Sequence, residues 1–356
     1  MSAPAPITPG PVWDVVNGLA GFGALAAALE LGVVDALAAA GDDGLPADGL
    51  AAAVGAADAG RVELLAELLV SLGLLTTDGT RFGLTPVAAR FLVRDSPASM
   101  AALAPLSPGP WSGWQRLAGT VRTGRPSDAT VAELAAAYPA LVRATAPTQA
   151  AVAAGVVREL AGRGLWPDAP RIADLGCGSA AWLVAMLGDR PAGTAVGVDL
   201  PAVLEVARAS VAAAGLTGRV DLLAADYLEA DLPAGGADVV VLAHVLRAEP
   251  ADRARRLLAR AVELTAPGGV VVVADYPRPD RADGPDPGRD AVLAAARHEL
   301  VLSLTMAAAT AGRGVSVADL RAWAAAAGAE LTDVLHPVPR QTVFLIRPDS
   351  PPVTER

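Results

Sequence analysis

The sequence has little cysteine, few aromatic residues and a deficit of positive charge. Its 356 residues include one cysteine, so no internal disulfide can form and nothing indicates an oxidising compartment. Aromatic residues make up 4% of the chain, while hydrophobic residues reach 53%, which allows a large core. The net charge of −10 argues against a nucleic-acid-binding surface, which needs a basic stripe.

Targeting and membrane signals are equally sparse. The opening residues lack the basic segment and apolar run of a secretory signal. Apolar stretches such as 15–29 are shorter than a membrane span and are followed by Glu30 and Asp35. We therefore expect a cytoplasmic protein without a membrane partner.

The pattern of residue types along the sequence predicts three structural regions. Residues 1–96 read as helices followed by a hairpin around Asp78-Gly79, a winged-helix pattern. Glu63 and Glu67 in its third helix oppose DNA binding, so packing or dimerisation is the favoured role, with a ligand-binding regulator as an alternative. Residues 97–170 predict a helical connector that caps a pocket and is broken at its prolines, Pro139 and Pro147 among them. Residues 171–356 alternate short β-branched runs with Ala-rich helices and end in a hairpin, which predicts an α/β domain with a doubly wound, mostly parallel sheet.

Polar residues stand where each predicted strand of the last part ends. Ligands of doubly wound sheets bind beyond the carboxyl ends of the strands, so these residues form a candidate site. In chain order, the strand ends carry Asp174, Asp199, Asp226-Tyr227, His244 and Asp275-Tyr276.

The spacing of these groups indicates a nucleotide. Gly176 and Gly178 let the backbone turn sharply and approach a ligand closely. Asp199 is placed to accept hydrogen bonds from ribose hydroxyls, and Asp226 to accept one from an exocyclic amine such as that of adenine. A dinucleotide fingerprint needs a third glycine where this chain has Ala181, so a nicotinamide dehydrogenase fits less well.

The stretches "DLGCGSA", "VGVDLPAVLEVARA", "AADYLEADLP" and "DVVVLAHVL" resemble class I S-adenosylmethionine-dependent methyltransferases. The whole chain is similar to small-molecule O-methyltransferases of the caffeate and hydroxyneurosporene type. That resemblance implies a Rossmann-like catalytic domain, a winged-helix dimerisation domain, a homodimer, and S-adenosylmethionine as cofactor. It implies a small-molecule acceptor, which we expect to be an aromatic or polyketide-like secondary metabolite. The implied cofactor-binding residues are Asp174, Gly176, Gly178, Asp199, Leu200, Asp226, Tyr227 and His244.

The sequence departs from this family at the catalytic position. The family carries a basic His in an "H-x-x-H-D-W" stretch, where this chain has "HVLRAE" and therefore Arg247. The family also tends to carry Glu where this chain has Gly314. Arginine stays protonated and cannot accept a proton from a phenol.

Three interpretations of Arg247 stay open. The enzyme could methylate by positioning alone, or Arg247 could pair with an anionic acceptor. Alternatively, the scaffold could perform non-methylating chemistry such as cyclisation, hydroxylation or decarboxylation. His244 and His298 are further candidate catalytic residues, with His298 the best substitute base.

No spacing of His, Cys and carboxylates predicts a metal site, and Cys177 lacks a neighbouring base that would make it a nucleophile.

Overall fold

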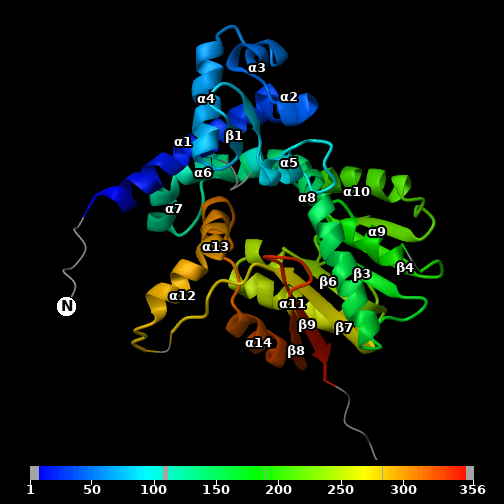
Figure 1. Cartoon of the computed structure of the whole chain (residues 1–356). Coiled ribbons are helices and arrows are strands. Elements are labelled where there is room, and N and C mark those ends of the chain that lie inside the picture. Colours follow the sequence, from blue (N-terminus) through cyan, green and yellow to red (C-terminus); the bar gives the residue numbers. More distant parts are fainter. Residues whose placement is uncertain (1–7, 107–110, 189, 283, 350–356) are drawn as a thin grey trace, which may run out of the picture. The chain divides into compact units, whose positions relative to one another are not determined.

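The computed structural model describes residues 8–106, 111–188, 190–282 and 284–349 (Figure 1). The chain separates into two compact units, Met1–Ser107 and Pro108–Arg356. Each unit has its own hydrophobic core. The finer division expected at residues 96 and 170 stays a prediction.

The first unit is a helical domain with a short hairpin. Its elements are α1 (Gly10–Leu31), α2 (Val33–Ala40), η1 (Gly41–Asp43), α3 (Ala47–Ala53), α4 (Ala59–Ser71), β1 (Leu75–Thr77), β2 (Phe82–Leu84), α5 (Pro86–Phe91) and η2 (Ala104–Leu106). Gly32 separates the first two helices, because it adopts a left-handed conformation with φ of +79° and ends α1. The predicted hairpin is confirmed, and Oδ1 of Asp78 accepts the N–H groups of Thr80 and Arg81 in its turn.

The second unit is a seven-stranded α/β domain. Its elements are α6 (Trp111–Gln115), α7 (Leu117–Thr123), α8 (Asp128–Gly162), β3 (Arg171–Leu175), α9 (Ala181–Leu187), β4 (Thr194–Asp199), α10 (Pro201–Ala213), β5 (Val220–Ala224), β6 (Ala237–Ala243), η3 (Leu246–Ala248), α11 (Ala251–Leu264), β7 (Thr265–Asp275), α12 (Arg289–Ala295), α13 (Arg297–Ala309), α14 (Val317–Ala326), β8 (Ala329–Leu335) and β9 (Thr342–Pro348). The strand order is β5-β4-β3-β6-β7-β9-β8. Strands β3 to β7 pair in parallel, and β9 runs antiparallel to both β7 and β8. The predicted doubly wound sheet and its terminal hairpin are confirmed.

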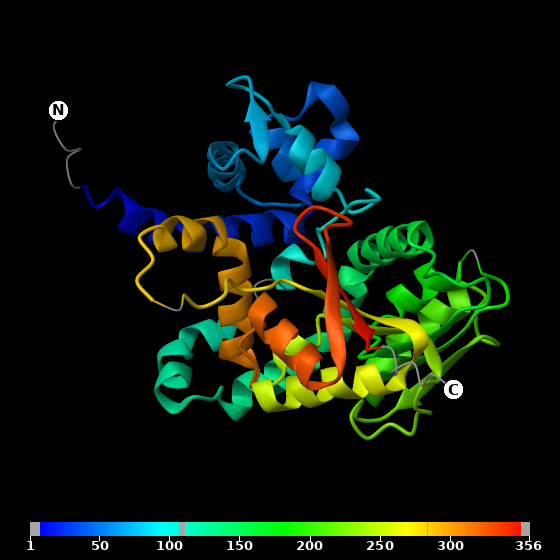
Figure 2. The ribbon, with the colours of Figure 1, turned by 90° about the horizontal axis from the view of Figure 1, so that it is seen from below.

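Helices cover both faces of this sheet. Alternate residues of β6 point to opposite sides: Val239 and Val241 join a core with α8, α9 and α10, whereas Val240 and Leu242 join one with α11 and α14. Figure 2 shows α11 and α14 lying side by side. Because both faces are buried, the strands are apolar throughout, as their sequences suggested.

Helix α8 corrects one expectation. We expected Pro139 and Pro147 to break the connector, but both lie inside one 35-residue helix. Proline removes one backbone hydrogen bond and favours a kink. The loss is outweighed by packing, because Val152, Val156 and Leu160 of the same helix are fully buried against the sheet.

The strand ends gather on one edge of the sheet. Strand β4 ends at Asp199 and β7 at Asp275, as the sequence predicted. Strand β6 ends one residue before His244, and β5 ends at Ala224, two residues before Asp226. Since β3 to β7 are parallel, the polar residues that follow them share the carboxyl edge.

Among the residues that the structure describes, two helices, α1 and α8, are apolar enough to cross a membrane by length and composition alone, and α12 with α13 passes that test as one bent pair. Helix α1 extends the apolar stretch 15–29 to 22 residues and includes Asp14 and Glu30, and α8 is 35 residues long. The apolar window of α8 is 28% buried and forms part of a core, whereas that of α1 is 11% buried. Five large apolar side chains in the first half of α1 are therefore exposed among the described residues of its unit and form an apolar face: Val12, Trp13, Val15, Val16 and Leu19.

Candidate active site

The loop after β3 places glycine backbone, which carries no side chain, at the carboxyl ends of the parallel strands. Gly176 has a φ of +90°, and a Cβ there would lie 2.3 Å from Cγ1 of Val245. Gly176 and Cys177 both donate their N–H groups to the carbonyl of Val198, which ties the loop to β4. Burial raises the pKa of the Cys177 thiol, which disfavours the nucleophilic thiolate. Only glycine at 176 leaves room for the loop to adopt this shape.

Asp199, the last residue of β4, holds the same loop in place through hydrogen bonds. Its Oδ2 accepts the N–H of Gly178 at 2.8 Å, and its Oδ1 accepts the N–H of Leu200 at 2.7 Å. Burial raises the pKa of Asp199, and these two donors oppose the rise. Each carboxylate oxygen can accept a second hydrogen bond, so Asp199 retains capacity for ribose hydroxyls. Leu200 itself is exposed and begins the turn into α10.

Asp174 is the buried acid of the site. It is 1% exposed, and neither carboxyl oxygen has a hydrogen-bond partner within the described part of the chain. Burial, together with the nearby charge of Asp199, raises the pKa of Asp174 well above its usual range. A buried carboxyl without a partner is costly, so this edge of the sheet favours a ligand that carries positive charge.

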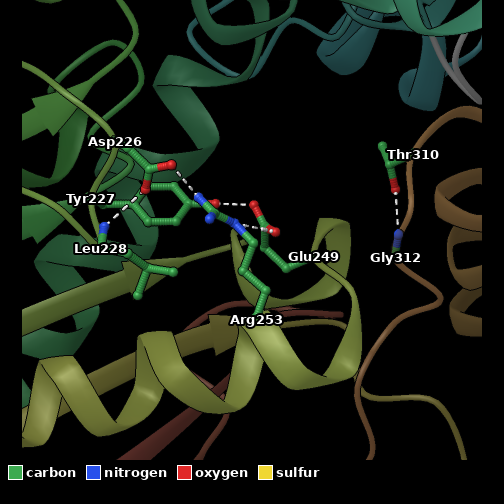
Figure 3. Close-up of polar contacts among 7 residues, drawn as sticks. All are labelled: Asp226, Tyr227, Leu228, Glu249, Arg253, Thr310 and Gly312. Carbon is green, nitrogen blue, oxygen red and sulfur yellow. Dashed lines mark hydrogen bonds and ion pairs between the residues drawn. The ribbon is translucent and has the colours of Figure 1, made fainter. Parts of the chain in front are cut away.

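Asp226 and Tyr227 belong to a closed polar network (Figure 3). Arg253 donates to Oδ2 of Asp226 at 2.5 Å, and its Nε lies 2.8 Å from Oε2 of Glu249. Tyr227 donates its hydroxyl proton to the other oxygen of Glu249. Burial would raise the pKa of Asp226, but the N–H of Leu228 and the Arg253 charge outweigh it and lower that pKa. Asp226 is therefore an ionised hydrogen-bond acceptor.

The three predicted catalytic residues meet around Tyr276, which follows β7. The ring of His244 stacks on Tyr276 with centroids 5.0 Å apart, and His298 contacts the same ring edge-on at 5.7 Å. The guanidinium carbon of Arg247 lies 5.2 Å from the ring centroid. The structure thus brings these groups together from three different elements, η3 and its preceding loop, the end of β7, and α13.

Both imidazoles are neutral near pH 7. Burial, with a smaller effect of the Arg247 charge, lowers the pKa of His244 to about 3. Its ring nitrogens have no partner in the described chain, and its φ of +61° is unusual for a residue with a side chain. Burial also lowers the pKa of His298, although Glu299 opposes this. A neutral imidazole can accept a proton, which is a base's first requirement.

Arg247 is held in place by the protein. It is 7% exposed, its Nε lies 3.9 Å from Oδ1 of Asp275, and it donates to the carbonyl of Leu302 at 3.1 Å. Burial raises the pKa of Asp275, and Arg247 opposes that rise. A guanidinium in this setting is a fixed positive charge and not a proton acceptor.

Gly314 cannot be replaced by a larger residue without movement. It has a φ of +75°, and a Cβ there would lie 2.5 Å from Oγ of Ser303 on α13. Its N–H donates to the carbonyl of Arg247 at 3.1 Å. Nearby, Gly312 donates to Oγ1 of Thr310 (Figure 3), and a Cβ on Gly312 would lie 2.2 Å from the same Arg247 carbonyl. The segment therefore packs directly on the backbone at position 247.

Two site residues escaped the sequence analysis. Tyr138 of α8 has a raised pKa because of burial and the charge of Asp199, and it packs with Val142, which lies against Gly178. Gln341 is buried and donates to the Tyr276 hydroxyl. Tyr138 lies in an unremarkable apolar helix and Gln341 in a loop before β9. The sequence offered no motif around either residue.

The parallel sheet, its glycine loop and the acids at successive strand ends define a class I methyltransferase fold. Two family models match the chain: the O-methyltransferase dimerisation domain over residues 13–94 and a methyltransferase domain over residues 172–269. The chain belongs to the O-methyltransferase family and is an S-adenosylmethionine-dependent methyltransferase.

Three known proteins illustrate the relationship. The chain is 31% identical over 330 residues to 3-hydroxy-5-methyl-1-naphthoate 3-O-methyltransferase of Streptomyces sahachiroi, covering 88% of both chains. It is 31% identical over 267 residues to the N,N-dimethyltransferase OxyT of Streptomyces rimosus, covering 71% of this chain and 74% of the relative. Human N-acetylserotonin methyltransferase in complex with S-adenosylmethionine shares the fold, with a TM-score of 0.76, 23% identity, and coverage of 98% and 100%.

The residues present fit the cofactor S-adenosylmethionine. Gly176 leaves bare backbone where a Cβ would collide with Val245. The unpartnered carboxyl of Asp174 suits the positive charge of this cofactor, which carries both a sulfonium and an ammonium group. Asp199 and Asp226 offer acceptor oxygens for ribose hydroxyls and an exocyclic amine.

Proposed function

We propose that the enzyme transfers a methyl group to a small aromatic, polyketide-like metabolite whose reacting group is already ionised. The relatives in Streptomyces support the acceptor class, because one of them methylates the hydroxyl of a hydroxynaphthoate. The aromatic and imidazole rings around Tyr276 suit a flat acceptor, since such rings stack on one another. Bound S-adenosylmethionine supplies an electrophilic methyl group on its sulfonium.

The protein's part in this reaction is to bind and align. Asp199, Asp226 and the loop at Gly176 hold the cofactor, and Leu200 and Tyr227 flank those acids. Val245 lies against this loop, and the preceding His244 stacks on the Tyr276 ring. Alignment of two reactants removes most of the entropic barrier to an in-line transfer.

The observation that carries the proposal is the pair Arg247 and Gly314. Position 247 holds a fixed cation, and position 314 is a glycine with a φ of +75° at which a Cβ would lie 2.5 Å from Oγ of Ser303, so a carboxylate side chain is disfavoured there. A general base with a supporting acid is therefore absent from these two positions. The Arg247 charge favours a phenolate or enolate over a neutral or cationic acceptor.

We further propose that the enzyme is a cytoplasmic homodimer. The dimerisation domain supports association, and the exposed apolar side chains of α1 provide a surface that a second copy would cover. The acidic net charge of the whole chain opposes nucleic-acid binding.

The test uses radiolabelled S-adenosylmethionine and hydroxynaphthoates or phenols of graded acidity. We expect transfer of label, with kcat/KM rising with pH through the pKa of each acceptor. The His298→Gln variant should show the same pH profile, because His298 is not required as a base. A pH profile of kcat/KM with one inflection at the same pH for every acceptor, which disappears in His298→Gln, would instead identify His298 as the base.

The missing base also supports a second candidate, non-methylating chemistry on the same scaffold. Mass spectrometry of the products separates the two. Methyl transfer replaces a hydrogen of the acceptor by a methyl group, which adds the mass of one CH2, and forms S-adenosylhomocysteine stoichiometrically. Cyclisation, hydroxylation or decarboxylation changes the acceptor's mass differently and leaves the cofactor unconsumed.

A further inference from the structure

The network around Asp226 extends beyond the acid that the family resemblance singled out. Asp226 and Tyr227 follow β5, whereas Glu249 and Arg253 lie just before and within the first turn of α11. Arg253 contacts both carboxylates, and Tyr227 closes the ring through its bond to Glu249. Arg253 also lies over the Tyr227 ring, 5.4 Å from its centroid. Figure 3 shows its guanidinium between the two acids.

We propose that Arg253, braced by Glu249, positions the Asp226 carboxylate as the acceptor for the exocyclic amine of the cofactor's nucleobase. This inference rests on the proposed role of Asp226 in cofactor binding. Arg253 is then a positioning residue that sets nucleobase specificity, and Tyr227 and Glu249 fix its geometry.

The hydrogen-bond pattern explains how specificity would arise. Oδ1 of Asp226 accepts from Leu228, and Oδ2 accepts from Arg253, so the side chain cannot rotate freely. Each oxygen keeps one lone pair, and an ionised carboxylate can only accept. The 6-amino group of adenine donates a hydrogen bond, whereas the 6-keto group of hypoxanthine accepts one. The fixed acid should therefore bind adenosyl compounds and repel inosyl compounds.

Arg256 on the same helix provides a matched control. Its charge also lowers the pKa of Asp226, but it is exposed and makes no hydrogen bond or ion pair to Asp226 within the described residues. Arg253→Met removes the charge and the contact, whereas Arg256→Met removes a charge alone. A comparison of the two separates positioning from a general electrostatic effect.

The experiment measures binding of S-adenosylhomocysteine and S-inosylhomocysteine to the full chain by calorimetry. The unsubstituted protein should prefer the adenosyl compound by at least about tenfold, the usual worth of a hydrogen bond to a charged group. Arg253→Met should weaken adenosyl binding by about tenfold and leave inosyl binding almost unchanged. Glu249→Gln should have a smaller effect of the same kind, and Arg256→Met should change neither affinity by more than about threefold.

Distinct results overturn the distinct claims. If the unsubstituted protein binds neither compound, the proposed function itself fails. If it binds both equally, or if Arg256→Met matches Arg253→Met, the inference fails while the proposed function stands. Circular dichroism of each variant confirms that a loss of binding does not come from unfolding.

Discussion

Replacement of Arg247 by Met tests whether this residue is a buried structural cation. Its side chain is 8% exposed and that of its partner Asp275 is 1% exposed, with 3.9 Å between Nε and Oδ1. Removal of one member of a buried ion pair leaves the other uncompensated, at a cost of about 3–5 kcal/mol. The variant also loses the bond to the Leu302 carbonyl and the contact with Tyr276. We expect a loss of stability in that range at pH 8.

The same variant should depend on pH in a defined direction. Burial already raises the pKa of Asp275, and without Arg247 that pKa rises further. A carboxyl whose folded-state pKa is raised stabilises the fold when protonated, and this stability is lost as pH rises through that pKa. Arg247→Met should therefore be less destabilised at pH 5 than at pH 8.

Urea unfolding at the two pH values measures both effects. Fluorescence of Trp166 and Trp182, which are buried in the second unit, follows the transition. The double variant Arg247→Met with Asp275→Asn should regain part of the loss, since no buried charge remains. A cost below about 1 kcal/mol at pH 8, or an equal cost at both pH values, would refute the buried pair.

Three further predictions concern the cofactor loop and the dimer. Gly176→Ala should weaken S-adenosylhomocysteine binding at least about tenfold in calorimetry, because its φ is +90° and its Cβ would meet Val245. Asp199→Asn should weaken the same binding by about tenfold or more, because an amide nitrogen cannot accept the N–H of Gly178. Val15→Asp places a charge on the exposed apolar face of α1 and should shift the protein from dimer to monomer in light scattering.

Each of these has a matched control. Gly218→Ala adds the same methyl group in open space, and Asp221→Asn neutralises an exposed acid on β5. Val334→Asp charges an exposed valine of β8. Equal effects of a control and its test variant would contradict the corresponding assignment.

The fold followed from local patterns in the sequence. Uninterrupted apolar runs such as that of β6 require burial on both faces, and strand–helix alternation leaves a parallel sheet as the simple solution. Asp199 and Asp275, the last residues of β4 and β7, could be predicted because the first charged residue after an apolar run marks the end of a buried strand. Helix α8 was read wrongly at Pro139 and Pro147, because packing outweighed the local preference of proline.

Local sequence patterns predicted only some of the residues of the candidate site. Asp199 and the glycine loop carry a motif, and their contact follows from neighbouring strands. The network of Glu249 and Arg253 depends on where the first turn of α11 meets the loop after β5, which no local pattern specifies. The meeting of His298 with Tyr276 likewise depends on the path of a long connection between β7 and α13.

The close packing of Gly314 against Ser303 has an evolutionary consequence. A histidine introduced at position 247 would lack a supporting acid at 314, and an acid introduced at 314 would place its Cβ 2.5 Å from Oγ of Ser303. Neither substitution alone would supply a base together with its supporting acid. The substitution at 247 would also remove the cationic partner of the buried Asp275. If the acceptor arrives ionised, as we propose, no single substitution at 247 or 314 would extend the enzyme to acceptors that must lose a proton.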